Sequence, residues 1–327
     1  MSVIEDVEPL QQKYLPEEII DREEERKQLQ NSGNQHLHGP RGTGKTHLVK
    51  KQFEESCYVS CLEHDTHYKA LRQILSQLSN TQVGTGHHTS ELQRKLEEHL
   101  EVLDITVVLD ELDFLLLNNG EDLLYFLSRL EKGPKITVVT ANTEDLADQL
   151  EPRTYSSLQP RRIQFEPYTG EQIYEILAER ARKSLAERSM HRDAVTYIAS
   201  KTQNAEAALT WLQLAARKAE ETVTEKLVQE VQKEARRVYV ENQLEKLSKH
   251  HSILYQAVRE LSDGSIVNAG DVYDRYQEIA SEYGEILSNR RISDHLKQLE
   301  HLNLVTAEYH YGGKKGKTRE VSLRSLQ

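Results

Sequence analysis

The sequence predicts an α/β core with a parallel sheet, then a helical region, and then a C-terminal winged helix. Two continuous runs rich in β-branched residues, ITVVL at 105–109 and ITVVT at 136–140, are typical of parallel strands buried on both faces. Strand and helix patterns alternate with short connections as far as Pro167. Beyond Gly170 the apolar residues recur at helical spacing, and the chain ends in a strand, a Gly/Lys-rich turn and a second strand.

Each element of the predicted core follows from a local pattern. A short strand leads straight into a glycine-rich loop, and a helix continues from that loop. The helix between the two β-branched runs stops at Gly133-Pro134, because these residues do not continue a helix. We therefore expect strands at 35–38, 57–60, 105–109 and 136–140, and helices at 46–55, 68–79, 90–100 and 121–131.

The C-terminal half has a different layout. A helical pattern runs from Gly170 to about Ser248, and its last stretch, 224–248, is a long charged helix that is expected to act as a connector. Three helices followed by a two-stranded ribbon, the layout of a winged helix, come next. We expect those helices near 252–261, 269–283 and 288–302, and the two strands at 305–311 and 319–323.

Composition narrows the class of protein. A formal net charge of −11 argues against a protein that coats nucleic acid over its whole surface. The segment 309–324 nevertheless holds five Lys/Arg against one Glu, so a DNA contact is expected there and just before it. No apolar run reaches the roughly 18 residues that span a bilayer, and the acidic N-terminus lacks a signal-peptide pattern. We therefore expect a cytoplasmic protein without a membrane segment, and we interpret Cys57 and Cys61 as packing residues.

The strongest motif follows the first predicted strand. GPRGTGKT at 39–46 is a full match to the phosphate-binding pattern G-x-x-x-x-G-K-[ST]. Its glycines let backbone N–H groups turn toward a phosphate, and the next helix adds its positive end to the same anion site. We expect Lys45 to reach the β and γ phosphates and the Thr46 hydroxyl to bind Mg²⁺. The predicted ATP site comprises Gly39, Gly42, Thr43, Gly44, Lys45, Thr46 and His47.

Polar residues follow both β-branched strands. Asp110 and Glu111 end the first, and ligands bind beyond the carboxyl ends of the strands in open α/β sheets. We expect Asp110 to hold Mg²⁺ through water and Glu111 to polarise the water that attacks the γ phosphate. Asn142, after the second strand, is expected to contact that water or the γ phosphate; alternatively it caps a turn. Together these signals predict a slow ATPase of the AAA+ class, with ATP and Mg²⁺ as cofactors.

The chain also resembles the archaeal Orc1/Cdc6 family over nearly its whole length. YLPE at 14–17, followed by Arg22-Glu23, resembles the family's adenine-side strap, and DELD at 110–113 is close to its D-E-[IVL]-D. The segments EPR at 151–153 and FEPY at 165–168, the charged connector and the C-terminal part are similar to its later features. The resemblance implies an AAA+ core at 1–167, a helical lid with the connector at 168–248 and a DNA-binding winged helix at 249–327.

The resemblance also implies roles for three residues outside the motifs. Tyr168 and Arg180 would line the adenine side of the nucleotide from the lid. Arg153 would sense or complete a γ phosphate, including that of a neighbouring subunit. The alternative for Arg153 is a surface ion pair with Glu151.

Two segments depart from the family pattern. Where the family shows G-D-A-R in sensor 2, this chain has QNAE at 203–206, so Glu206 stands where a positive charge normally touches the γ phosphate. In the place of the family's DNA-contacting insert, residues 83–91 carry no Lys or Arg. The first departure calls into question the coupling between hydrolysis and lid movement, and the second calls into question a DNA contact there.

The predicted DNA surface lies in the winged helix. The helix at 288–301 would be the recognition helix, since arginine reads guanine in the major groove and lysine holds phosphates. The wing is expected to contact the backbone or minor groove; alternatively it is a solvated hairpin tip. The expected DNA contacts are Asn289, Arg290, Arg291, His295 and Lys297 on the helix, and Lys314, Lys315, Lys317 and Arg319 on the wing.

The resemblance thus implies an ATP-binding replication initiator that recognises origin DNA. It would help to recruit the replicative helicase and self-associate on DNA, with ATP hydrolysis as a switch. The rival hypothesis is a DNA-binding regulator or paralogue whose nucleotide is structural or barely hydrolysed. A transposon or plasmid ATPase is a weaker third hypothesis, which the winged helix and the connector disfavour.

Overall fold

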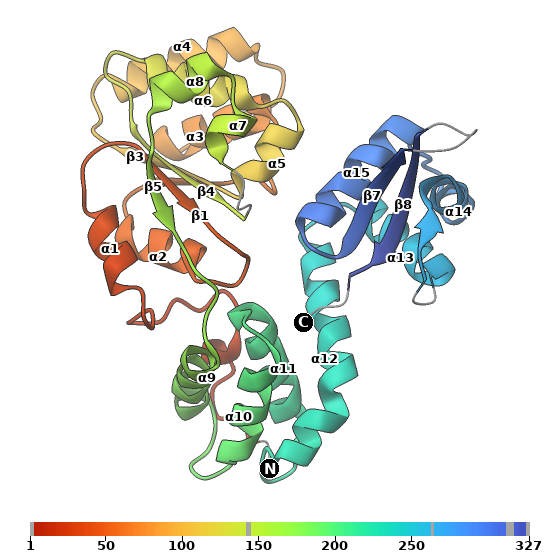
Figure 1. Cartoon of the computed structure of the whole chain (residues 1–327). Coiled ribbons are helices and arrows are strands. Elements are labelled where there is room, and N and C mark those ends of the chain that lie inside the picture. The colour runs from red at the N-terminus through yellow and green to blue at the C-terminus, as the bar shows by residue number, and fades with distance from the viewer. Residues whose placement is uncertain (1–2, 142–144, 263–264, 312–316, 325–327) are drawn as a thin grey trace. The chain divides into compact units, whose positions relative to one another are not determined.

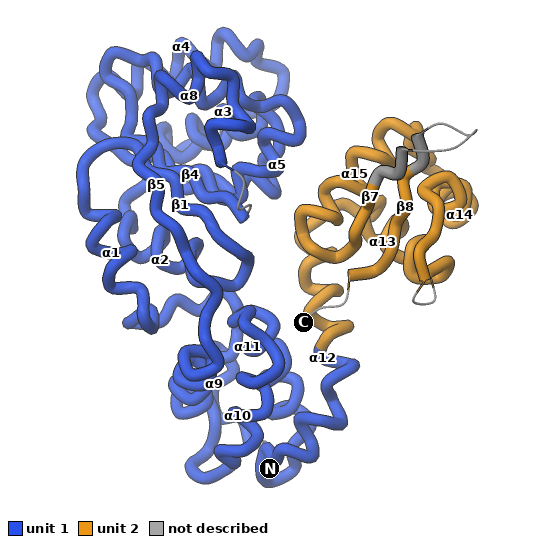
Figure 2. The backbone as a smooth tube through the Cα atoms, in the orientation of Figure 1, with its two compact units in different colours: residues 1–235 blue, residues 236–327 orange. Residues whose placement is uncertain are grey.

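The computed structural model describes residues 3–141, 145–262, 265–311 and 317–324 (Figure 1). The chain divides into two compact units, residues 1–235 and 236–327 (Figure 2). The boundary between the units falls within helix α12 (Glu225–Glu245), which is the predicted connector helix. The predicted domain bounds differ from these units and remain a prediction.

The first unit contains a five-stranded parallel sheet in the order β2-β3-β4-β1-β5. Its strands are β1 (Gln35–His38), β2 (Cys57–Ser60), β3 (Thr106–Asp110), β4 (Lys135–Thr140) and β5 (Arg161–Gln164). The first four confirm the predicted strands. The edge strand β5 was not predicted, because only Ile163 of its four residues is buried and apolar.

Side chains alternate across the strands and so build two apolar clusters, one on each face of the sheet. The helices of the core are α1 (Glu23–Leu29), α2 (Lys45–Gln52), α3 (His67–Leu78), α4 (Thr89–Leu100), α5 (Leu112–Leu117), α6 (Glu121–Arg129), α7 (Leu146–Gln149) and α8 (Pro152–Leu158). Val107 and Leu109 pack with α3, α4, α6 and α8, whereas Val108 packs with α1 and α2. These two groups of helices cover opposite faces in Figure 1.

The helical region after the sheet has a core of its own. Helices α9 (Gly170–Ser184), α10 (Arg192–Lys201) and α11 (Ala205–Lys218) share one cluster of buried side chains. Helix α9 begins with a capping box, in which the Thr169 side chain accepts from the Gln172 N–H and the Gln172 side chain accepts from the Thr169 N–H. Val3 and Leu10, from the N-terminal segment and its short 3-10 helix η1 (Glu8–Leu10), belong to the same cluster.

The second unit is the predicted winged helix. Its helices are α13 (Lys249–Ser262), α14 (Ala269–Ser281) and α15 (Asn289–His301), and its ribbon is β7 (Val305–Tyr311) with β8 (Lys317–Leu323). The two-residue strand β6 (Val267–Asn268) adds to β8 and was not predicted, because so short a strand leaves no periodic pattern. Within the described part of the chain, no helix combines the length and the apolar character that crossing a membrane requires.

Candidate functional site

The glycine-rich loop between β1 and α2 has a backbone conformation that depends on its three glycines. Gly39, Gly42 and Gly44 have φ angles of 143°, 74° and 88°, in the region that side-chain-bearing residues rarely adopt. A Cβ added to Gly39 would lie 2.2 Å from the carbonyl oxygen of Phe165. The loop therefore lies tight against the segment after β5, and helix α2 starts directly after it.

Lys45, the first residue of α2, is buried and folds back over the loop. Its Nζ donates to the carbonyl oxygens of Gly39 and Pro40, both at 2.6 Å. Burial, and to a smaller extent the positive charge of Arg41, lowers the pKa of Lys45 to about 8. The ammonium group thus lies within the loop, and its predicted contact with the β and γ phosphates stays a prediction.

Thr46 and Asp110 meet across the loop and the end of β3. The Thr46 hydroxyl donates to Asp110 Oδ2 at 2.8 Å, and the Tyr58 hydroxyl donates to the same oxygen at 2.7 Å. Hydroxyl and carboxylate oxygens are the donors that Mg²⁺ prefers, with water and substrate phosphates completing its shell. In the described residues, no group of three or more acidic, His or Cys side chains could hold a metal ion.

Glu111 is held by two side chains that were not predicted as site residues. Its Oε1 accepts from Arg41 Nη1 at 2.9 Å, and its Oε2 accepts from the Ser60 hydroxyl at 3.3 Å. Glu111 has a φ of 56°, in the left-handed region, and directly precedes α5. Arg41 occupies a position that the phosphate-loop pattern leaves open, so sequence reasoning gave no signal for this ion pair.

Arg22 connects the loop with the segment that enters the helical region. It is 5% exposed, and its Nε donates to Thr43 O at 3.0 Å while its Nη2 donates to Glu166 O at 2.8 Å. The guanidinium lies 4.2 Å from the centroid of the Tyr168 ring, in a cation–π contact. Tyr168 is buried, and its hydroxyl would be 2.6 Å from a Cβ at Gly44. The predicted residue Tyr168 therefore contacts the loop.

Arg180 lies against the N-terminal segment that includes the predicted adenine-side strap, and its role toward the adenine stays a prediction. It is 4% exposed, donates to Pro9 O at 3.1 Å, and lies 4.5 Å from the centroid of the Tyr14 ring. Burial, and next the charge of Arg180, lowers the pKa of His47, whose side chain also bonds to the backbone of Tyr14 and Gln12 in the N-terminal segment. That segment holds the Arg180 guanidinium because its carbonyl groups satisfy the buried donors.

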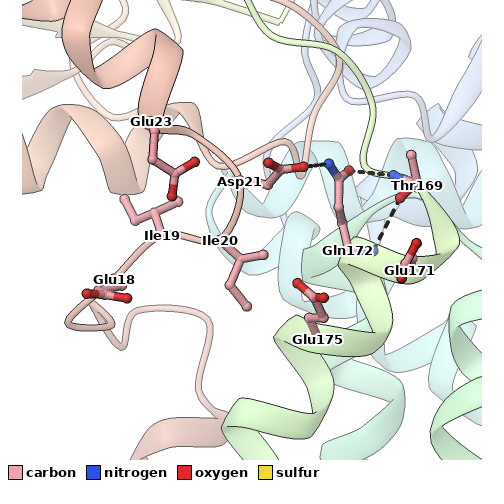
Figure 3. Close-up of a pocket in the computed structure, with 9 residues that line it drawn as sticks. All are labelled: Glu18, Ile19, Ile20, Asp21, Glu23, Thr169, Glu171, Gln172 and Glu175. Atoms are coloured by element: carbon pink, nitrogen blue, oxygen red, sulfur yellow. Dashed lines mark hydrogen bonds between the residues drawn. The ribbon is translucent and has the colours of Figure 1, made fainter.

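A cavity of about 620 Å³ opens between residues 18–23 and the start of α9 (Figure 3). The side chains of Asp21 and Gln172 bond to each other across it. Five of the residues that line it are carboxylates, which disfavours a phosphate there. The lining residues are Glu18, Ile19, Ile20, Asp21, Glu23, Thr169, Glu171, Gln172 and Glu175.

The start of α11, which carries the departure from sensor 2, touches the glycine-rich loop. Asn204 Oδ1 accepts from the Ala207 N–H at 3.0 Å and thereby caps the helix. The Ala205 N–H donates to Gly42 O at 3.1 Å. Glu206 is the second residue of this helix and is partly buried.

The two other predicted catalytic residues are Asn142 and Arg153. Asn142 lies outside the described residues. Arg153, on α8, is 60% exposed, pairs with Glu151 at 2.7 Å, and lies 5.0 Å from the centroid of the Tyr125 ring. This is the surface ion pair that was the alternative for Arg153, and its role toward a γ phosphate stays a prediction.

Helix α15 separates its apolar and polar residues as a DNA-reading helix would. Ile292, Leu296 and Leu299 are buried in the unit. The predicted contacts Asn289, Arg290, Arg291 and Lys297 are all exposed. The remaining helix candidate, His295, instead packs on the His251 ring at a centroid distance of 4.0 Å.

Two of the four predicted wing contacts lie within the described residues. Lys314 and Lys315 lie outside the described residues, and Lys317 is the first residue of β8. Arg319 is buried and donates to Glu300 Oε2 at 3.1 Å, contrary to the expectation of a DNA contact. Its side chain shares a face of β8 with the buried Val321, two residues along, which turns it toward α15.

This fold and this loop define a nucleotide-binding protein of the AAA+ class that carries a C-terminal winged helix. The family model described as an AAA domain matches residues 28–150, and the model described as the CDC6 C-terminal winged helix domain matches residues 242–326. The chain belongs to the family of ORC1-type DNA replication proteins, which includes the archaeal Orc1/Cdc6 proteins that it resembles.

One relative and two solved structures illustrate the similarity. ORC1-type DNA replication protein 1 of Sulfurisphaera tokodaii is 32% identical over 347 residues, covering 95% of this chain and 87% of that one. The Aeropyrum pernix ORC1 protein, solved in complex with DNA, is 28% identical with a TM-score of 0.78, covering 99% of this chain and 95% of that one. Cdc6p of Pyrobaculum aerophilum shares the fold, with 22% identity, a TM-score of 0.64, and coverage of 99% and 96%.

Proposed function

We propose that this protein is an ATP-dependent initiator that binds duplex DNA at replication origins. The observation that carries the proposal is the hydrogen bond between Thr46 and Asp110, which lies beside the phosphate loop. The family of ORC1-type DNA replication proteins supplies the biological context. Recruitment of the replicative helicase, self-association on DNA and a cytoplasmic location belong to the same proposal.

The loop residues would bind the triphosphate and the metal. Lys45 would exchange its bonds to loop carbonyls for bonds to the β and γ phosphates, and the N–H groups at the start of α2 would face the same anion. Thr46 and Asp110 would hold Mg²⁺, which neutralises phosphate charge when bound. Glu111 would accept a hydrogen bond from the attacking water.

Other residues would complete the site from neighbouring segments. Tyr168 packs against the Arg22 guanidinium and would contact the nucleotide from the side of the helical region. Arg180 and His47 would support that side through the N-terminal segment. Asn142 and Arg153 would act on the γ phosphate, Arg153 in a neighbouring subunit because it is exposed.

The winged helix would read DNA through α15. The exposed Arg290 and Arg291 suit guanine in the major groove, while Asn289 suits adenine. Lys297 and the wing lysines Lys314, Lys315 and Lys317 would contact phosphates. Arg319, which is bonded to Glu300 inside the unit, is left out of this surface.

Glu206 favours a second candidate function. Its helix begins against the phosphate loop, and a carboxylate facing the nucleotide from there would repel the γ phosphate, so that nucleotide would be bound without effective turnover. In that case the protein would be a DNA-binding regulator or a specialised paralogue with a structural nucleotide.

A turnover assay separates the two candidates. ATP hydrolysis would be measured for the parent and for Glu111→Gln, each with and without duplex DNA. The initiator proposal predicts slow turnover by the parent, a change in rate with DNA, and no turnover by Glu111→Gln despite retained ATP binding. A parent rate equal to that of Glu111→Gln under both conditions would favour the regulator.

A further inference from the structure

Arg41 joins the phosphate loop to the residue proposed to orient the attacking water. Its Nη1 lies 2.9 Å from Glu111 Oε1, and the two side chains are 12% and 22% exposed. The guanidinium also lies 5.7 Å from the centroid of the Phe114 ring. Because Ser60 donates to the other carboxylate oxygen, both oxygens of Glu111 accept hydrogen bonds from the protein.

We propose that Arg41 is a positioning residue that changes partner with the nucleotide. It pairs with Glu111 when the γ phosphate is absent and pairs with the γ phosphate when ATP is bound. The inference rests on the proposed nucleotide function and adds to it a residue that distinguishes ATP from ADP.

The charges around the loop support the exchange. Arg41 lies on the loop and Lys45 begins α2, close enough for the charge of Arg41 to contribute to the lowered pKa of Lys45. Two cations in a partly buried site repel each other, and a polyanion between them removes that repulsion. A guanidinium can donate two parallel hydrogen bonds to a phosphate, so the γ phosphate is a strong competitor for Arg41.

The exchange would link phosphate recognition to the state of Glu111. Departure of Arg41 leaves Glu111 Oε1 free to accept a hydrogen bond from water, at the moment when the γ phosphate is in place. ADP has no γ phosphate, so Arg41 keeps its bond to Glu111 in the ADP state. Arg41 should therefore contribute to ATP affinity much more than to ADP affinity.

A double-mutant cycle on nucleotide affinity tests this without any need for turnover. The four proteins are the parent, Arg41→Met, Glu111→Gln and the double variant. Each is titrated with ADP and with an ATP analogue that has a non-hydrolysable β–γ bond, with Mg²⁺ present. Arg94→Met is the matched control, because Arg94 is an exposed arginine in an ion pair with Glu98.

The expected result is that Arg41→Met weakens the ATP analogue by about tenfold to a hundredfold, the usual worth of a charged hydrogen bond. ADP affinity should change less than about threefold, since the lost interaction is with the γ phosphate. Glu111→Gln should tighten the analogue when Arg41 is present and leave it unchanged when Met stands at position 41. Arg94→Met should bind both nucleotides as the parent does.

Glu111→Gln could instead raise the affinity for the ATP analogue equally with Arg and with Met at position 41. That result would overturn the exchange, because it would reflect only the lost repulsion between Glu111 and phosphate. Circular dichroism establishes that each variant is folded, and Arg41→Gln replaces Arg41→Met if the latter is not. A parent that binds neither nucleotide would overturn the proposed nucleotide function itself, and the inference with it.

Discussion

The side chain of Asn204 lies directly against Gly42, so that a Cβ at Gly42 would come within 2.2 Å of Asn204 Oδ1. The Ala205 N–H also donates to Gly42 O, so the first turn of α11 is anchored on the phosphate loop. A movement of the loop on nucleotide binding would therefore move the start of α11. Glu206 is the next residue along this helix, so its position would change with the loop.

We predict that Glu206→Arg makes the protein favour ATP over ADP by about 1–3 kcal/mol relative to the parent. If Glu206 occupies the sensor 2 position, the substitution replaces a repulsive charge near the γ phosphate with a charge-assisted hydrogen-bond donor. The ATP-to-ADP affinity ratio is the measurement, and Glu220→Arg, an exposed change of the same charge, is the control. A parent that already prefers ATP strongly and does not respond to the arginine would contradict this account of sensor 2.

The lowered pKa of Lys45 predicts proton uptake on ATP binding in alkaline solution. With a pKa of about 8 in the free protein, Lys45 is mostly neutral at pH 9, and a bound triphosphate favours its charged form. ATP binding should then take up roughly 0.9 proton at pH 9, and affinity should fall as pH rises above about 8. Calorimetry in two buffers of different ionisation enthalpy measures the uptake. No uptake at pH 9 would mean that Lys45 is charged before ATP binds.

The buried His36 predicts loss of stability in mild acid. Burial lowers its pKa to about 3, so the unfolded chain binds a proton below pH 6.5 that the folded chain rejects. The stability contributed above pH 6.5 is therefore lost as pH falls from 6.5 toward 3. Between pH 7 and pH 5 this amounts to about 2 kcal/mol in the free energy of unfolding of the first unit.

Denaturant unfolding of the parent and of His36→Gln at both pH values tests this. The variant should lose about 2 kcal/mol less than the parent between pH 7 and pH 5. The exposed His88, changed to Gln, should leave the pH dependence unaltered. Parallel losses in parent and His36→Gln would rule out His36 as the source of acid sensitivity.

The exposed arginines of α15 predict a sequence-dependent loss of DNA affinity. Changing Arg290 or Arg291 to Ala should cost about 1–3 kcal/mol more on the preferred site than on random duplex, because a base contact is lost. Binding titrations on both duplexes at fixed salt give the difference. Arg259→Ala, an exposed change on α13 in the same unit, should weaken neither selectively. An equal loss on both duplexes would make the α15 arginines phosphate contacts only.

Local patterns were sufficient for most of the fold and for the centre of the site. The phosphate loop and Asp110 could be predicted because a motif and the end of a buried strand are both patterns of consecutive residues. The edge strand β5 and the short helices α5, α7 and α8 could not, because they are too short or too polar to leave a periodic pattern.

Contacts between distant segments of the chain could be identified only from the structure. Arg22 reaches Glu166, and Arg41 reaches Glu111, across separations that no local pattern encodes. For Arg319 a signal was present, since it lies two residues from the buried Val321 and so on the same face of the strand. Arg319 was grouped with the lysines of the Gly/Lys-rich turn, which is why a buried partner of Glu300 was interpreted as a DNA contact.

Genome-wide mapping of the DNA bound by this protein in its own cells tests the central claim most directly. The account predicts occupancy concentrated at replication origins and reduced when Lys45 is changed to Ala, since the phosphate loop would then no longer hold ATP. Occupancy spread over promoters without enrichment at origins, unchanged by Lys45→Ala, would contradict an ATP-dependent initiator and point to the regulator.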